Sequence, residues 1–158
     1  MRVIVFSDTH GDFRAADSIM VSNLNVCDHY IFLGDGLQEF DIIKEKYPDK
    51  HYYCVAGNCD KAEAPEEAVI EIYGTKIYLT HGHLLGVKES LDRLTKNAKS
   101  AGAEIALFGH THCRFNETIN GIHVMNPGSA SQPEDELPPS YAFIELSLYG
   151  SGCAHVDL

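Results

Sequence analysis

The segment Val3-Ile4-Val5-Phe6-Ser7-Asp8-Thr9-His10 sets the pattern on which the rest of the sequence is built. A run of four apolar residues leads, after one serine, into an aspartate and a histidine. Short runs of β-branched and aromatic residues are typical of buried strands. The aspartate and the histidine therefore stand where a strand gives way to a loop.

Four further segments repeat this arrangement of an apolar run followed by a side chain that can bind a metal ion. Residues 30–33 precede Asp35, residues 52–55 precede Asn58, residues 77–79 precede His81, and residues 105–108 precede His110. Loops at the carboxyl ends of strands in an α/β sheet converge on one rim, where ligands bind. Five such strand ends therefore predict a single site.

The order of the predicted elements indicates an α/β fold. Asp12 is the predicted N-cap of a first helix, and helical spacing of apolar residues predicts a second helix from residue 37 to residue 47, ended by Pro48. With three strands these helices form a βαβαβ unit, which implies parallel strands and right-handed crossovers. A third amphipathic helix is predicted over residues 87–101, before Gly102.

The remaining strands are predicted to form antiparallel hairpins. Their predicted turns lie at Gly74, at Asn120-Gly121, which is typical of a type I′ turn, and at Tyr149-Gly150-Ser151-Gly152. Residues 62–67 and 132–139 are polar, contain proline and are expected to be mobile loops. Mixed strands with three helices favour two packed sheets with the helices outside.

Composition and charge restrict the classes of function. The chain of 158 residues fits a single domain, residues 1–158, with a substantial core, and its 44% hydrophobic content is ordinary for a soluble protein. We see neither a membrane span nor a secretory signal, and we expect a cytoplasmic protein. The net charge of −11 disfavours nucleic acid and anionic membranes as partners.

The five cysteines are odd in number and include no Cys-x-x-Cys pair. A disulfide framework or a structural zinc site is therefore not expected, and reduced thiols are the better interpretation. Most of these cysteines are expected to be small buried apolar residues. Cys59 and Cys113 differ, because they stand beside the predicted metal ligands.

The candidate ligands offer carboxylate, amide and imidazole donors but no thiolate. They are Asp8, His10, Asp35, Asn58, His81, His110 and His112. Such a set suits Mn²⁺, Fe²⁺, Ni²⁺ or Zn²⁺, and seven ligands suit two ions with a bridging carboxylate. Two ions roughly 3.5–4 Å apart can share a hydroxide and stabilise in-line displacement at phosphorus. The pattern therefore predicts phosphoester hydrolysis by metal-bound hydroxide, without a covalent enzyme intermediate.

Each motif taken alone has a simpler explanation. Asp8 could cap the next helix, and Gly34-Asp35 and Gly57-Asn58 fit ordinary turns. Gly109-His110-Thr111-His112 is more specific, because two histidines at i and i+2 after a buried strand rarely serve packing. The joint pattern is what favours a metal site. The histidines outside these motifs are expected on the surface or in hairpins: His29, His51, His123 and His155.

In the order and spacing of its motifs the chain resembles the calcineurin-like metallophosphoesterases. The resemblance runs over essentially the full length, from Asp8 to the strands past Asn126-Pro127-Gly128-Ser129. It is closest to a small prokaryotic phosphodiesterase branch, the YfcE-like proteins. Members of that branch carry segments similar to Gly57-Asn58-Cys59-Asp60 and to Asn126-Pro127-Gly128-Ser129.

The resemblance implies a fold, a cofactor and roles for individual residues. The fold is a four-layer αββα sandwich of two mixed β-sheets flanked by helices, commonly assembled into homodimers or homotetramers. The cofactor is a pair of divalent ions, most often Mn²⁺, with Zn²⁺, Ni²⁺, Fe²⁺ or Mg²⁺ as alternatives. The implied ligands are Asp8, His10 and His112 for the first ion, Asn58, His81 and His110 for the second, and Asp35 as the bridge.

The chain departs from the phosphoprotein-phosphatase branch at two positions. Cys59 stands where that branch has the histidine credited with protonating the leaving group, and Gly36-Leu37-Gln38 follows Asp35 in place of its x-x-Asp-Arg-Gly pattern. Protein phosphatase activity is therefore not expected, and poor alkoxide leaving groups should react slowly. We hypothesise that His83 or a metal-bound water supplies the proton. That His83 only orients a neighbouring ligand is an equal alternative.

These observations support one leading function and two alternatives. The leading prediction is a binuclear metal-dependent enzyme acting on small phosphodiesters, and also on phosphomonoesters, with His83 and Asn58 as its catalytic residues. The first alternative is a non-catalytic scaffold for protein binding, the use that a retromer subunit makes of this fold. The second is an anion- or metal-responsive binding module. The complete ligand set favours the enzyme.

Overall fold

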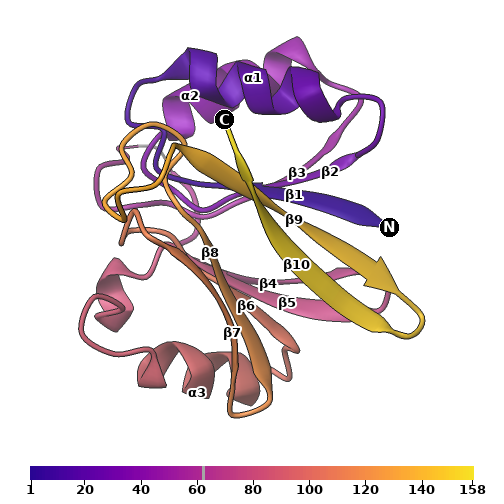
Figure 1. Ribbon diagram of the computed structural model, residues 1–158, viewed down its shortest axis with the longest axis vertical. Helices are drawn as coiled ribbons and strands as arrows, with labels where there is room; N and C mark the ends of the chain where they lie inside the picture. Colours follow the sequence, from indigo (N-terminus) through magenta and orange to yellow (C-terminus); the bar gives the residue numbers. More distant parts are fainter. Residues whose placement is uncertain (62) are drawn as a thin grey trace.

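The computed structural model describes residues 1–61 and 63–158 of the chain. Two five-stranded sheets pack face to face, with helices α1 and α2 on the outer face of the first and helix α3 on the outer face of the second (Figure 1). This order of helix, sheet, sheet and helix confirms the predicted αββα sandwich. No helix in the described part of the chain is long and apolar enough to cross a membrane.

The first sheet combines the βαβαβ unit with the last two strands of the chain. Its order is β10 (Gly150–Asp157), β9 (Ser140–Ser147), β1 (Arg2–Phe6), β2 (His29–Phe32) and β3 (His51–Cys54). Strands β1, β2 and β3 are parallel, as predicted, and β9 pairs antiparallel with β1. The central place of β1 puts its carboxyl end, and hence Asp8, in the middle of the rim.

The second sheet contains two of the predicted hairpins. Its order is β4 (Glu67–Ile72), β5 (Thr75–Thr80), β6 (Ile105–Leu107), β8 (Ile122–Pro127) and β7 (Arg114–Ile119). Strands β5, β6 and β8 are parallel, so β5 and β6 end at the same rim. Asn120 and Gly121 both have positive φ, 53° and 82°, as a type I′ turn requires.

Strand alternation produces two separate apolar layers around the first sheet. One set of side chains packs between the two sheets and includes Val3, Val5, Ile31, Leu79 and Leu107. The other packs beneath α1 (Phe13–Asn23) and α2 (Leu37–Lys46) and includes Ile4, Phe6, Tyr30, Phe32 and Phe40. Because both faces of these strands are covered, their sequences are continuous apolar runs rather than alternating ones.

The first two helices agree with the sequence prediction. Helix α1 begins after Asp12, whose carboxylate accepts a hydrogen bond from the backbone N–H of Ala15, as expected of an N-cap. Helix α2 ends at Lys46, two residues before Pro48.

The third predicted helix, residues 87–101, is wrong over its first five residues. Helix α3 covers only Asp92–Ser100, and a short 3₁₀ helix, η1 (His83–Leu85), lies before it. Residues 87–89 form a turn instead of the start of a helix. Val87 is nevertheless buried and packs with the α3 side of the core, so its apolar character reflected packing rather than helix.

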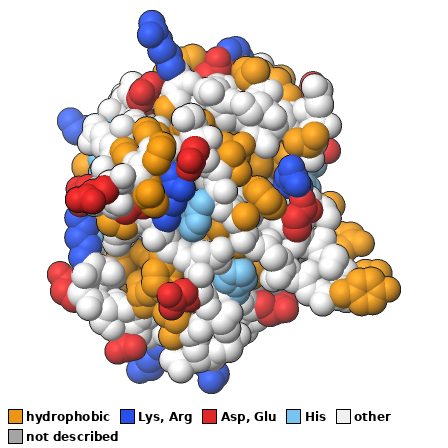
Figure 2. Space-filling model, in the orientation of Figure 1, with side chains coloured by type: hydrophobic (Ala, Val, Ile, Leu, Met, Phe, Trp, Pro, Cys, Tyr) orange, Lys and Arg blue, Asp and Glu red, His pale blue; other side chains and the backbone are white. Residues whose placement is uncertain are grey.

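The last hairpin has a tighter turn than predicted. Strand β10 already starts at Gly150, which pairs with Ser147, so the turn is Leu148-Tyr149 alone. These two side chains are 84% and 99% exposed at a tip that projects from the molecule (Figure 2). The predicted loop 62–67 begins outside the described residues, and Glu67 at its end already belongs to β4.

The core between the sheets should respond strongly to a cavity. Replacing the fully buried Ile31 by alanine should lower the free energy of unfolding by about 3 kcal/mol, because transfer energy is lost and a void remains. Urea denaturation measures this change. The matched control is Ile42→Ala on α2, where the isoleucine is 51% exposed and little change is expected. Equal effects at the two positions would contradict the assigned core.

Candidate metal centre

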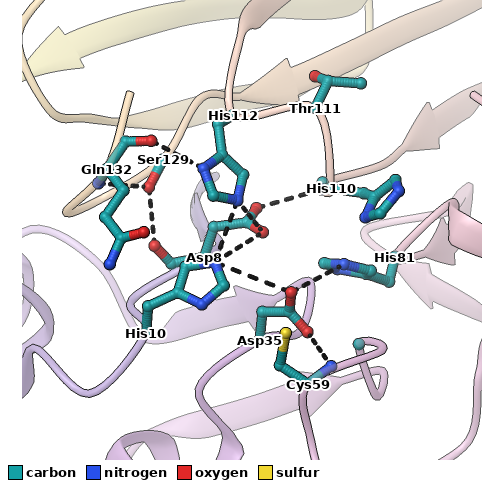
Figure 3. Close-up of polar contacts among 12 residues, drawn as sticks. Asp8, His10, Asp35, Cys59, His81, His110, Thr111, His112, Ser129 and Gln132 are labelled. Atoms are coloured by element: carbon teal, nitrogen blue, oxygen red, sulfur yellow. Dashed lines mark hydrogen bonds and ion pairs between the residues drawn. The ribbon is translucent and has the colours of Figure 1, made fainter. Parts of the chain in front are cut away.

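The predicted ligands follow strand ends from both sheets, and these ends meet at one rim (Figure 3). Backbone hydrogen bonds hold the converging loops together. The N–H of Asp8 donates to the carbonyl of Gly34 at 3.0 Å, and the N–H of Gly109 donates to the carbonyl of His81 at 3.1 Å. The first bond joins the segments that follow β1 and β2 in the first sheet. The second joins the segments that follow β5 and β6 in the second sheet.

The backbone at the site is unusual, because most of the predicted ligands adopt a left-handed conformation. Positive φ values occur at Asp8 (56°), His10 (44°), Asp35 (58°), His110 (67°) and His112 (56°). Such values are uncommon outside glycine, cost on the order of 1 kcal/mol each, and cluster at functional sites. The strands therefore end in sharp turns that the surrounding structure must maintain.

A first group of donors consists of Asp8, His10 and His112. The Nε2 atoms of the two imidazoles are 3.0 Å apart, and His112 Nε2 lies 3.2 Å from an Asp8 carboxylate oxygen. His112 Nδ1 donates to the carbonyl of Gln132 at 2.7 Å, which fixes the ring and directs Nε2 into the site. The backbone carbonyl thus selects the ring nitrogen that is available to a metal.

A second group consists of Asp8, Asp35 and His81. The fully buried His81 donates from Nδ1 to the carbonyl of Leu33 at 2.7 Å, and its Nε2 has no hydrogen-bond partner in the described part of the chain. This Nε2 lies 3.4 Å from an oxygen of Asp35, which is itself 3.8 Å from His10 Nε2. Asp35 thus belongs to the second group and also lies near His10 of the first, and its role as a bridging carboxylate stays a prediction.

The other two predicted ligands lie at the margin of this cluster. The His110 ring is 5.1 Å from the His81 ring, and the His110 backbone N–H donates to Asp8 at 3.2 Å. Asn58 is exposed, and its amide nitrogen lies 3.4 Å from the sulfur of Cys59. The arrangement places both residues next to the cluster, and their roles as ligands stay predictions.

His83 faces the same site, although it opens η1 rather than ending a strand. Its ring lies 5.4 Å from the His81 ring and 6.1 Å from the His110 ring, between centroids. Its Nδ1 is buried and has no hydrogen-bond partner among the described residues. The ring is therefore near enough to the predicted ligands to serve either of the roles proposed from the sequence.

The charges around the site call for a cation. Burial raises the pKa of Asp35, but the neighbouring His81 imidazole and the backbone N–H of Cys59 outweigh it and hold the pKa below its usual range. Burial lowers the pKa of His81, but Asp35 and Asp8 outweigh it and raise the pKa overall. Both pKa shifts have the same cause: the negative carboxylates and a positive charge beside them stabilise each other. A divalent ion at this position would be stabilised in the same way.

The imidazoles and the thiol differ in their environments. The hydrogen bond to Asp8 raises the pKa of His112, whereas burial and the neighbouring His81 lower the pKa of His110. A neutral imidazole is the form that binds metal. Burial and Asp35 raise the pKa of Cys59, so its thiol stays protonated near neutral pH.

Carboxylate and imidazole donors of this kind fit divalent transition metals. The unpartnered Nε2 of the buried His81 faces a carboxylate oxygen, so an ion between the two would satisfy both. The residues present therefore fit the metal centre that the sequence predicts.

Asp60 contributes to the site in a way that the sequence analysis missed. Its carboxylate accepts four backbone hydrogen bonds of 2.8–2.9 Å. The donors are the N–H groups of Asp35, Gly36, Leu37 and Gly57. One side chain thus joins the loop after β2 to the loop after β3. A carboxylate beside Asn58 was visible in the sequence, but nothing there showed which backbone it would bind.

The segment Asn126–Ser129 supports the site from behind. The buried Asn126 donates to the carbonyl of Gly109 at 2.9 Å, and the buried Ser129 hydroxyl donates to the carbonyl of Asp8 at 2.8 Å. In the sequence this segment stood out only through its resemblance to the YfcE-like proteins. In the structure it is the end of β8 and the two residues after it, and it braces two of the ligand-bearing loops.

A sandwich of this topology, with aspartates and histidines gathered at one rim, defines a class of metal-dependent proteins. The model of the calcineurin-like phosphoesterase superfamily domain matches residues 1–148. The chain therefore belongs to that superfamily.

Similar proteins agree with this assignment. The probable metallophosphoesterase YsnB of Bacillus subtilis is 33% identical over 148 residues, which are 92% of this chain and 85% of that protein. The phosphodiesterase YfcE of Escherichia coli K12 is 28% identical over an alignment of 169 positions that covers 92% of this chain and 88% of that protein. The structure of a predicted phosphoesterase from Streptococcus pneumoniae TIGR4 superimposes with a TM-score of 0.80 at 28% identity, covering 98% and 97% of the two chains. The sequence resemblance is thereby confirmed.

Asp60 should be required for the order of the ligand loops. Asp60→Asn removes the charge and replaces one acceptor oxygen by a donor amide facing backbone N–H groups. The free energy of unfolding should fall by about 2 kcal/mol, and Mn²⁺ affinity should fall about tenfold or more. Thermal melts and metal titration measure the two effects. The control Asp49→Asn, at an exposed position, should change neither. Unaltered metal binding in Asp60→Asn would contradict the proposed bracing.

Proposed function

We propose that the protein is a binuclear metal-dependent phosphoesterase that hydrolyses small phosphodiesters, and phosphomonoesters as a further class. The observation that carries the proposal is the position of the Asp35 carboxylate. One of its oxygens lies 3.8 Å from His10 Nε2 and 3.4 Å from His81 Nε2, between two sets of donors. One carboxylate shared by two donor sets is the arrangement that two neighbouring ions need.

Two divalent ions, Mn²⁺ in the first place, would acidify a coordinated water and neutralise charge on the phosphate during in-line displacement. The protein's own part is to hold the donors in place before the substrate arrives. Carbonyl contacts fix the rings of His81 and His112, and Asp60 and Ser129 fix the loops of the two aspartates. Donors held in this way need little rearrangement when charge develops at phosphorus.

His83 is the proposed proton donor to the leaving alcohol. Its ring lies beside those of His81 and His110, and its buried Nδ1 has no partner among the described residues. Cys59 is a weak candidate, because burial and Asp35 raise the pKa of its thiol. The alternative, in which His83 only orients His110, predicts a different dependence on the leaving group.

The second candidate function is a non-catalytic scaffold. The observation that favours it is the projecting β9–β10 tip, where Leu148 and Tyr149 are almost wholly exposed (Figure 2). Large exposed apolar side chains at a tip are suited to protein contacts. The intact set of predicted ligands favours the enzyme, since a scaffold has no use for it. Assembly into a homodimer or homotetramer and a cytoplasmic location are further parts of the proposal.

The enzymatic proposal predicts a metal-dependent activity. The protein with added Mn²⁺ should hydrolyse bis(p-nitrophenyl) phosphate, and a chelator should abolish the reaction. His110→Ala should lower kcat/KM at least about 100-fold, because one side of the metal centre loses a donor. His51→Ala, at an exposed position on β3, is the control and should keep full activity. Absence of any turnover with several divalent ions would favour the scaffold.

Substrates with different leaving groups distinguish a proton-donating His83 from one that only packs against its neighbours. His83→Ala should lower kcat on an alkyl phosphodiester by about 100-fold. It should lower kcat on an aryl diester much less, because p-nitrophenolate leaves without a proton. The ratio of the two rates in the variant and the parent protein is the measurement. A uniform loss on both substrates, or intact alkyl ester hydrolysis, would exclude His83 as the proton donor.

A further inference from the structure

A pocket of about 360 Å³ opens directly beside the metal centre. Its inner wall includes His10 and Asp35, two of the predicted ligands. Its outer wall is formed by the first turn of α2 and by Cys59, Asp60 and Lys61. A phosphate held at the centre would therefore place one of its ester groups at or in this pocket.

Glu39, in the first turn of α2, lies on the pocket wall. Its carboxylate covers the turns at Gly11 and Gly36: a Cβ atom at Gly36 would lie 3.1 Å from one of its oxygens, and a Cβ at Gly11 would lie 3.6 Å from the other. Gly11 follows the predicted ligand His10, and Gly36 follows Asp35. The carboxylate is therefore held over the two loops that carry metal ligands.

Another residue, Asp60, already makes the hydrogen bond that a glutamate at this helical position usually makes. A glutamate in the third position of a helix commonly accepts a hydrogen bond from the N–H of the N-cap residue. Here the N–H of the N-cap Gly36 donates to Asp60 at 2.8 Å. The ion pairs of the lysines on α2 go elsewhere, Lys44 to Asp41 and Lys46 to Asp17. Among residues 1–61 and 63–158, no side chain or backbone group forms a hydrogen bond or ion pair with the Glu39 carboxylate, which lines the pocket.

A second polar group without a partner lies under the same wall. The Thr9 hydroxyl is wholly buried and has no hydrogen-bond partner among the described residues. It lies so close to Gly36 that a Cβ there would be 1.8 Å from its oxygen. Because this hydroxyl is wholly buried and is not part of the pocket lining, a polar ligand group in the pocket would meet the Glu39 carboxylate instead.

We infer that Glu39 is a specificity residue that accepts a hydrogen bond from a hydroxyl or ammonium group on the alcohol portion of the phosphoester. The inference rests on the proposed function and names its substrate class: esters of polyols or amino alcohols rather than of plain alkyl or aryl alcohols. Carboxylates bind such donors through charge-assisted hydrogen bonds. The exposed Lys61 also lines the pocket, so the lining includes a second charged group, which suits this class.

Calorimetric titration of the Mn²⁺-loaded protein tests this inference without relying on turnover. Glycerol 3-phosphate offers hydroxyls, ethanolamine phosphate offers an ammonium group, and n-propyl phosphate offers neither. At least one of the first two should bind about tenfold more tightly than propyl phosphate, as one hydrogen bond to a charged group provides. Which of the two is preferred identifies the donor.

The variant Glu39→Ala should reduce this preference to less than about twofold. The control Glu45→Ala, at an exposed position further along α2, should retain it. Glu39→Gln keeps the shape of the side chain and replaces Glu39→Ala if a thermal melt shows that the alanine variant is unfolded; it should still lose preference for the ammonium ligand.

Two results would overturn the inference: equal binding of the three phosphates by the parent protein, or a preference that persists in the Glu39 variants. Hydrolysis of bis(p-nitrophenyl) phosphate by the same preparation tests the proposed function separately. A preparation that hydrolyses this diester but binds the three phosphates equally would contradict only the assignment of Glu39. A preparation that discriminates through Glu39 but turns over no diester would contradict the enzymatic proposal instead.

Discussion

The site depends on the electrostatic attraction between two buried aspartates and the imidazoles around them. Asp8 and Asp35 are almost completely buried, at 0% and 2% exposure, where an isolated carboxylate would be very costly. The nearest compensation comes from His81 and His112, whose pKa values these carboxylates raise. A pair of divalent ions would supply that charge more fully. The fold therefore places buried negative charge at one rim of the sandwich, and this charge favours the binding of the cations on which the proposed chemistry depends.

The rest of the molecule can be understood as a support for this unfavourable arrangement. Five of the predicted ligands adopt left-handed backbone conformations, which persist only where the surroundings enforce them. The enforcing contacts come from distant parts of the chain: Asp60 binds the loop of Asp35, and Ser129 binds the carbonyl of Asp8. Gly57 must lack a side chain, since a Cβ there would lie 2.1 Å from an Asp35 oxygen. Stability and site geometry are thus coupled through a few hydrogen bonds and close approaches.

The sequence predicted the structure best in segments where a single physical requirement determines the choice of residues. Buried parallel strands require continuous apolar runs, so the strands were predicted closely; the ligand roles of the residues that follow them stay predictions. The prediction failed where two rules competed. Val87 and Leu91 are apolar because they pack on the core, yet residues 87–91 are not helical and α3 begins only at Asp92. The contacts of Asp60 and the position of the Glu39 carboxylate depend on which distant parts of the chain lie nearby, and a single sequence does not contain that information.

The central claim is that the rim holds two divalent ions on one set of side chains. Its most direct test is the metal content of the protein. The protein is stripped of metal with a chelator, reloaded with Mn²⁺ and separated from unbound ion. Elemental analysis then gives the ratio of manganese to protein. The account predicts two ions per chain, with calorimetry of the same reloading giving the same stoichiometry. One ion per chain, or none, would contradict it.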